Sequence, residues 1–340
     1  MRLAAAVAVV LSSAAVAACG SDDGDNGTTA AQTGTQAAAS GSFPVTIEHK
    51  FGSTEIPEDP ERIVTVGFSE QDHVLALGER PVATREFLGG YDWPNRPWAQ
   101  EALGGEEIEV IGGDEINFEA VAAQRPDLIL ALNAGLVDDD YERLSKIAPT
   151  IAQSGEYVDF GMPWEEQTAV IGKAIGREEE AQEVIADVQA AFEQAREEHP
   201  EFEGATSIMA YGGPDGYGAY TTEDLRSRIL SDLGFELPEK IDQLAGDSFY
   251  VDLSSEQFRL LDADAVLMYG PQDDIASDPV FSRLDAVKED RVIYIDIPDD
   301  FAGAIGFASP LSLPWALERA VPELATALDG DPQTKIQQPE

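Results

Sequence analysis

The stretch from Arg177 to His199 constrains the fold of this chain more than any other. It contains no Gly or Pro before Pro200 and consists mainly of strong helix formers. Apolar residues recur with the 3, 4, 7 spacing of one helix face, at Ala181, Val184, Ile185, Val188, Phe192 and Ala195. The stretch predicts a helix roughly 34 Å long. It is either a surface helix of one α/β domain or a rod that joins two lobes, because α/β patterning stops before it and begins again after it.

The first residues have the layout of a secretory signal. Arg2 precedes an apolar run from Leu3 to Val10, and small residues lead to Cys19. The run is too short to remain as a transmembrane helix. Residues 16–19, Val-Ala-Ala-Cys, resemble a bacterial lipobox, in which the Cys is diacylated and becomes the mature N-terminus. Cys19 is the only cysteine, so an internal disulfide is excluded. We expect a protein anchored by lipid to the outer face of the cell membrane.

Composition then divides the chain into regions. Residues 20–42 are a Gly/Ser/Thr/Ala/Gln/Asp mixture that cannot bury a core, which is typical of a flexible tether. We expect an N-terminal α/β lobe over 43–163, a helical region over 164–200, a C-terminal α/β lobe over 201–330 and a flexible tail over 331–340. The chain carries 65 acidic and 21 basic residues, a net charge of −44, which argues against nucleic acid as a partner.

Strands and helices alternate on both sides of the long helix. A hairpin over 43–56 precedes buried strands at 62–67, 81–85 and 128–132, and in the second half strands follow at 207–211, 264–267 and 291–295. Residues 213–220 are expected to form a loop at the carboxyl end of a strand, where open α/β sheets bind ligands. This alternation predicts parallel, doubly wound sheets.

A short internal repeat relates the two halves. Glu119 is followed after seven residues by Asp127, and Glu256 after seven residues by Asp264, each on a helix that runs into a buried strand. Each Glu is the second residue after a capping Asn117 or Ser254. On position alone they are helix N-terminal acids, worth about 0.3–1 kcal/mol each through the helix dipole.

Several segments together resemble the iron-siderophore substrate-binding proteins of ABC importers, a family that also includes cobalamin and haem binders. The resemblance runs from Phe43 to Leu328 and rests on the order and spacing of Pro60–Val64, Glu70 with Leu75–Gly78, Arg125–Leu130 and Ile147–Thr150. It implies two Rossmann-like lobes joined by one long rigid α-helix, with the ligand in the cleft between them. It also implies that Glu119 and Glu256 dock onto arginines of the membrane permease, one anchor on each lobe.

The resemblance implies a monomer that captures a ferric siderophore and delivers it to the permease, without a cofactor of its own. Hydroxamate, catecholate and carboxylate complexes all remain open, as do cobalamin and haem. Such ligands are held by aromatic stacking and by Arg or Tyr donors. The candidate ligand contacts are Arg85, Tyr91, Trp93, Trp98, Tyr217, Tyr220, Arg226, Phe249, Tyr250 and Phe301. Trp93 and Trp98 have an alternative, which is to fold onto the core.

Enzyme and metal sites have little support in the sequence. The three His residues, His49, His73 and His199, are scattered and have no Cys or second His at ligand spacing. No G-x-S-x-G elbow, P-loop or G-x-G-x-x-G occurs. A lipid-anchored α/β hydrolase is the alternative from another functional class. We expect a binding protein without catalytic residues or a metal centre.

Overall fold

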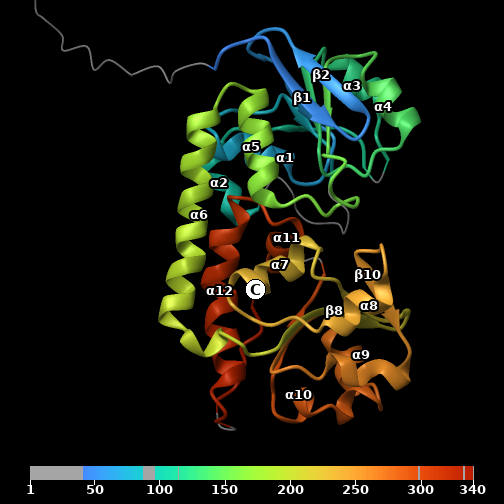
Figure 1. The fold of residues 1–340 in the computed structure, drawn as a ribbon, viewed down its shortest axis with the longest axis vertical. Coiled ribbons are helices and arrows are strands. Elements are labelled where there is room, and N and C mark those ends of the chain that lie inside the picture. Colours follow the sequence, from blue (N-terminus) through green and yellow to red (C-terminus); the bar gives the residue numbers. More distant parts are fainter. Residues whose placement is uncertain (1–40, 87–95, 114, 298, 332–333, 340) are drawn as a thin grey trace, which may run out of the picture. The chain divides into compact units, whose positions relative to one another are not determined.

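The computed structural model describes residues 41–86, 96–113, 115–297, 299–331 and 334–339, within the compact unit Ala39–Glu340. These residues form two five-stranded sheets, and a short hairpin packs near the first sheet (Figure 1). The hairpin consists of β1 (Val45–His49) and β2 (Gly52–Ile56). Cys19, the lipobox and most of the expected tether lie outside the described residues.

The first sheet is parallel throughout. Its strands lie in the order β5 (Glu109–Val110), β4 (Ala83–Thr84), β3 (Ile63–Thr65), β6 (Leu128–Ala131) and β7 (Thr150–Ala152). Alternate residues of β3 and β6 enter different cores: Ile63 and Leu128 face one side, Val64 and Ile129 the other. Both faces are buried, which explains why these strands read as continuous apolar runs.

Helices cover both faces of this sheet. One face packs against α1 (Glu70–Ala76) and α5 (Trp164–Ala174), and the other packs against α3 (Phe118–Ala123) and α4 (Asp138–Leu144). The short helices η2 (Pro97–Ala99) and α2 (Gln100–Leu103) follow the undescribed residues 87–95. The predicted doubly wound first half is therefore confirmed.

The second sheet is mixed, which corrects one expectation. Its order is β10 (Tyr250–Leu253), β9 (Gly216–Tyr220), β8 (Ser207–Gly213), β11 (Ala265–Tyr269) and β12 (Val292–Ile295). Strands β8, β11 and β12 are parallel, whereas β9 and β10 are antiparallel to their neighbours. The expected loop 213–220 is thus mostly strand, because Gly213 and Gly216 adopt the positive φ angles that let β8 turn tightly into β9.

The helices of the second half lie on both faces of its sheet. One core contains residues of α7 (Leu225–Asp232), α11 (Asp300–Phe307) and α12 (Ser312–Leu328). The opposite core contains residues of α8 (Glu239–Ala245), η4 (Ser255–Leu261), α9 (Gln272–Ser277), η5 (Phe281–Arg283) and α10 (Asp285–Lys288). The segment that carries Glu256, which the sequence predicts as a helix, is the 3-10 helix η4.

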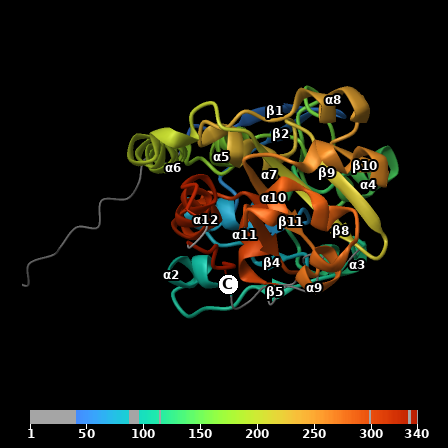
Figure 2. The ribbon, with the colours of Figure 1, turned by 90° about the horizontal axis from the view of Figure 1, so that it is seen from below.

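The long helix α6 (Glu178–Glu198) joins the two halves, which confirms the rod interpretation. Near its start, Ala181 is buried in the core of the first half. Further along, Val188, Phe192 and Ala195 are buried in the core that contains α12, and η3 (Pro200–Phe202) then leads into the second sheet. Figure 2 shows α6 and α12 side by side. At about 1.5 Å per residue its 21 residues extend roughly 30 Å. In the described part of the chain, no helix is long and apolar enough to cross a membrane.

Candidate ligand-binding cavity

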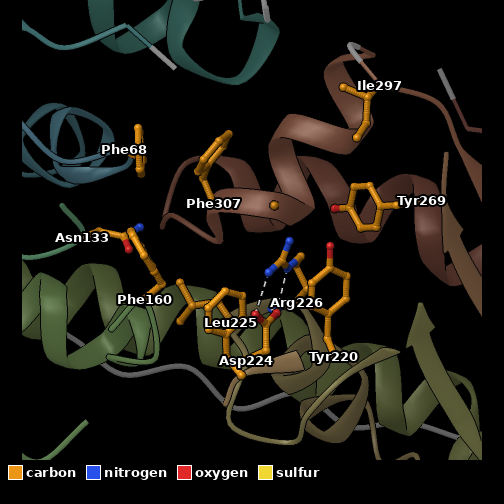
Figure 3. A pocket seen from close by; sticks show the side chains of 12 residues that line it. Phe68, Asn133, Phe160, Tyr220, Asp224, Leu225, Arg226, Tyr269, Ile297 and Phe307 are labelled. Atoms are coloured by element: carbon orange, nitrogen blue, oxygen red, sulfur yellow. Dashed lines mark hydrogen bonds and ion pairs between the residues drawn. The ribbon is translucent and has the colours of Figure 1, made fainter. Parts of the chain in front are cut away.

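A cavity of about 350 Å³ lies between side chains of the two halves (Figure 3). The first half contributes Phe68, Asn133 and Phe160. The second half contributes Tyr220, Asp224, Leu225, Arg226, Phe249, Tyr269, Ile297, Gly306 and Phe307. Most of this wall is aromatic or aliphatic, and its polar groups are few, which is the usual make-up of a small-molecule site.

Strand ends determine where the cavity lies. Phe68 and Asn133 follow the carboxyl ends of β3 and β6 in the first sheet, and their backbones are hydrogen bonded, Phe68 N to Asn133 O at 3.2 Å. Tyr269 ends β11 and Ile297 follows β12 in the second sheet. Open α/β sheets bind ligands at the carboxyl ends of their parallel strands, and here the corresponding ends of two sheets line one cavity.

A buried carboxylate holds the first-half wall in place. Glu70 has no exposed surface, and its Oε1 accepts a hydrogen bond from the backbone N–H of Asn133 at 2.7 Å, while Oε2 accepts from Ser69 N at 3.2 Å. Burial raises the pKa of Glu70, although backbone donors, Asn133 first, oppose the shift. A Cβ at Gly67 would lie 2.0 Å from the Glu70 carboxylate, so only glycine leaves room for this contact. Glu70 therefore ties together the loops that present Phe68 and Asn133.

Phe160 has an unusual backbone conformation at the cavity wall. Its φ of +65° lies in the left-handed region that non-glycine residues rarely occupy. Its ring stacks with Phe68 at 6.1 Å between centroids and meets Phe249 of the other half edge-on at 6.2 Å. A Cβ at Gly135 would come within 2.6 Å of the Phe160 ring. The strained loop thus directs Phe160 to the junction of the two halves.

Arg226 and Tyr220 form the polar part of the second-half wall. The Arg226 guanidinium lies 3.5 Å from the centre of the Tyr220 ring and donates from Nε to Asp224 Oδ1 and from Nη2 to Asp224 Oδ2, both at 2.7 Å. Burial alone would lower the pKa of Arg226, but the Asp224 carboxylate outweighs it and the pKa lies above its usual range. Burial also raises the pKa of Tyr220, so its hydroxyl stays protonated at neutral pH.

Two donors remain for a ligand. Among the described residues, neither Tyr220 Oη nor Arg226 Nη1 has a hydrogen-bond partner. Figure 3 shows the Tyr220 hydroxyl and the guanidinium edge that Asp224 does not use turned toward the side of Tyr269 and Phe307. A rigid pair of donors in an aromatic enclosure is suited to bind the oxygen atoms of a bulky organic ligand.

Comparison with known proteins identifies the family. The family model described as "Periplasmic binding protein" matches residues 63–298. The chain belongs to the periplasmic binding protein family. Members are transport components rather than enzymes and work outside the cytoplasm, so the family match does not support the hydrolase alternative.

Individual relatives of this periplasmic binding protein agree with the family match. The Fe(3+)-citrate-binding protein YfmC of Bacillus subtilis is 26% identical over 258 residues, 74% of this chain and 78% of YfmC. YhfQ of the same organism, named as a putative ABC transporter substrate-binding lipoprotein, is 25% identical over 85% of this chain and 88% of its own length. The structure of PiaA from Streptococcus pneumoniae TIGR4 in complex with ferrichrome has a TM-score of 0.75 at 28% identity, covering 84% of this chain and 99% of PiaA.

Some residues proposed from the sequence line the cavity of this periplasmic binding protein. Tyr220, Arg226 and Phe249 are part of its wall. Arg85 lies behind the wall, with its guanidinium 4.5 Å from the centre of the Phe68 ring and its Nε donating to Gly113 O at 2.8 Å. Tyr91 and Trp93 lie outside the described residues.

Other proposed residues lie away from the cavity wall. Trp98 is buried, packs against Trp315 and donates from Nε1 to Asp72 Oδ2 at 2.8 Å, so the core alternative holds for this residue. Phe301 is also buried, in the same core. Tyr217 packs between Phe258 and Phe281 on the opposite face of the second sheet, and Tyr250 is exposed on the outer strand β10.

The sequence reasoning missed most of the cavity wall. Phe68 and Asn133 follow strands that the sequence predicts in the first half, and Tyr269 ends a strand that it predicts in the second half. The strand-end rule was applied only to residues 213–220, and its use at every predicted strand would have found these three residues. Phe160, Phe307 and Ile297 come from loops and a helix end, where no periodic signal marks them. Their role depends on how the two halves meet.

The internal repeat of Glu and Asp has a structural basis in both sheets. Asp127, just before β6, accepts hydrogen bonds from the backbone N–H groups of Glu61 and Arg62, which precede the neighbouring β3. Asp264, just before β11, accepts from the backbone N–H and hydroxyl of Thr206, which precedes the neighbouring β8. In both sheets, therefore, one carboxylate joins the starts of the two central parallel strands.

Glu119 and Glu256 are both exposed and lie in the first turn of the helix that precedes the Asp of this repeat. The Asn117 side chain caps the first of these helices by accepting from Ala120 N at 3.1 Å, and Ser254 with Gln257 forms a capping box on the second. The two carboxylates thus occupy equivalent positions in the two halves. Neither is engaged by another side chain in the described part of the chain.

Proposed function

We propose that this protein is the substrate-binding component of an ABC importer that captures a ferric siderophore in the cavity and delivers it to the membrane permease. The observation that carries the proposal is the aromatic cavity between the two halves, with the Arg226 and Tyr220 donors in its wall. The relatives support it, because PiaA was solved with ferrichrome and YfmC is named for binding Fe(3+)-citrate.

The chemistry of the cavity suits such a cargo. A ferric siderophore encloses its iron in a shell of chelator oxygens, so the protein contacts the chelator rather than the metal. Phe68, Phe160, Phe249 and Phe307 offer apolar surface to the organic periphery, and Arg226 and Tyr220 offer donors to the oxygens. Within the described residues no group of three or more His, Cys, Asp or Glu is placed to hold a metal ion directly.

Delivery requires attachment and docking. We propose that Cys19 carries a lipid that retains the monomeric protein at the outer face of the cell membrane, with residues 20–42 as its tether; the lipoprotein name of YhfQ supports this. We further propose that Glu119 and Glu256 pair with arginines of the permease. Their exposure and their equivalent places in the two halves fit a partner that has one similar site for each half.

Titration of the purified protein with ferric complexes, followed by tryptophan fluorescence, tests the cargo. Ferrichrome, ferrioxamine B, ferric enterobactin, ferric citrate, cobalamin and haem form the panel. We expect at least one ferric complex to quench the fluorescence saturably. Arg226→Ala should weaken its binding about 10-fold or more, because a charge-assisted hydrogen bond contributes about 1.5–3 kcal/mol.

Arg228→Ala is the matched control, because Arg228 lies on the same helix α7 but lines a separate small cavity. It should change the affinity by less than about twofold. Binding of cobalamin or haem but of no ferric siderophore would refute the cargo assignment. Equal affinities of the wild type and Arg226→Ala would refute the assigned role of the cavity.

A further inference from the structure

Asp224 neutralises Arg226, which is the one basic side chain among the described residues of the cavity wall. Its carboxylate binds two edges of the Arg226 guanidinium, Nε and Nη2, at 2.7 Å each, and its side chain is 2% exposed. It also caps helix α7, accepting from the backbone N–H of Arg226 at 2.9 Å. The cap holds the carboxylate and the Tyr220 ring holds the guanidinium, so neither partner is free to swing away.

The other described residues of the wall carry no charge. Among the described residues that line the cavity, Asp224 is the only carboxylate and Arg226 the only basic side chain, and Tyr220, whose pKa is raised by burial, stays protonated at neutral pH. Arg85 lies outside the wall behind Phe68, with hydrogen bonds to two backbone carbonyls. The described wall therefore has a net charge of zero.

A neutral aromatic cavity discriminates between classes of ferric complex. A tris-hydroxamate such as ferrichrome is neutral, whereas a tris-catecholate such as ferric enterobactin carries three negative charges. Moving an anion from water into this cavity removes its hydration without supplying an opposite charge. The net charge of −44 on the chain adds a long-range repulsion of the same sign.

We propose that Asp224 determines the charge selectivity of the cavity: by pairing with Arg226 it makes the site electrically neutral, so that the site accepts neutral hydroxamate-type ferric complexes and discriminates against anionic catecholate and carboxylate complexes. This inference rests on the proposed function and specifies its cargo class. Asp224 contacts Arg226 and acts on the ligand largely through that contact, so it is a positioning residue.

The test compares the dissociation constants of ferrichrome and ferric enterobactin on the purified protein at one ionic strength. The wild type should bind ferrichrome at least 10-fold more tightly. Equal or tighter binding of ferric enterobactin would overturn the inference and leave the siderophore function standing. Failure of every ferric complex to bind would overturn the proposed function, and this inference with it.

Variants isolate the role of the ion pair. Asp224→Asn keeps the helix cap, since Asn is as good a cap as Asp, but releases the positive charge of Arg226. The preference for ferrichrome over ferric enterobactin should fall at least 10-fold. The double change Asp224→Asn with Arg226→Gln makes the pair neutral again and should restore much of the preference. Asp215→Asn, in the exposed turn between β8 and β9, makes the same change in net charge and should leave the preference unaltered.

Retention of the wild-type preference by Asp224→Asn would overturn the role of Asp224. An equal loss of preference in Asp215→Asn would also overturn it, because the effect would then follow the net charge of the protein rather than the ion pair. Circular dichroism of each variant confirms that the comparison is made between folded proteins.

Discussion

Replacing Asp72 by Ala should destabilise the protein more than almost any other single loss of a carboxylate. Asp72, on α1, has no exposed surface. It accepts hydrogen bonds from Trp98 Nε1 at 2.8 Å and from Ser309 Oγ at 2.9 Å, and it pairs with Arg96 Nη2 at 3.3 Å. Ser309 lies between α11 and α12 in the second half, so Asp72 joins the two halves through a buried polar contact.

The expected loss follows from the burial of Arg96. Its side chain is 1% exposed, and burial lowers its pKa to about 9, opposed by Asp72 and Asp300. Removing one partner of a buried pair typically costs about 3–5 kcal/mol, because the remaining charge keeps its desolvation penalty. Asp72→Ala should therefore reduce the free energy of unfolding by about that amount. Ser309→Ala removes two hydrogen bonds, the one that Ser309 Oγ donates to Asp72 and the one that it accepts from Ser312 N at 3.0 Å, and should cost about 2 kcal/mol.

Urea unfolding, followed by circular dichroism and tryptophan fluorescence, measures both losses. The effect of Ser309→Ala should become smaller in the Asp72→Ala background, because the acceptor is already gone. Asp187→Ala, at an exposed position of α6, is the control and should shift the free energy of unfolding by less than about 0.5 kcal/mol. A cost below about 1 kcal/mol for Asp72→Ala, or full additivity with Ser309→Ala, would refute this account.

Two further predictions concern the buried His73 and the exposed pair Glu119 and Glu256. Burial lowers the pKa of His73 to about 3, so the unfolded state binds the extra proton and stability should fall by about 1.4 kcal/mol per pH unit as the pH drops from 6.5 towards 3. In His73→Gln, the free energy of unfolding should change less steeply with pH over this range. A slope equal to that of the wild type would contradict the role of His73. Glu119→Ala with Glu256→Ala should abolish siderophore-dependent uptake in cells while leaving ligand affinity intact, unlike the exposed pair Glu101→Ala with Glu239→Ala. Normal uptake by the first pair would contradict docking at these positions.

The local periodicity of apolar residues was sufficient to predict much of the fold. The apolar run of β6 and the single apolar face of α6 could be read from the sequence, because strands buried on both sides and amphipathic helices leave signals within ten to twenty residues. Residues 213–220, which contain β9, are expected from the sequence to be a loop, since this strand is rich in Gly and Tyr and lacks the branched residues that mark strands. The antiparallel part of the second sheet was therefore missed.

Which residues line the cavity depends on strand register and on contacts between distant segments, and local sequence patterns show neither. Tyr217 and Tyr220 are three residues apart in β9, so their side chains point to opposite faces of the sheet. Tyr217 enters the core against Phe258, and Tyr220 reaches the cavity beside Arg226. Only knowledge of the strand and its register separates these two similar residues.

By itself the sequence determined the two α/β halves, the helix that links them and the family, because these features rest on local propensity and on the order of short motifs along the chain. The tertiary structure alone decided which aromatic residues face the cavity and that Asp224 neutralises Arg226. The cavity wall comes from strand ends and loops as far apart as Phe68 and Phe307, and such residues meet only when the two halves pack together.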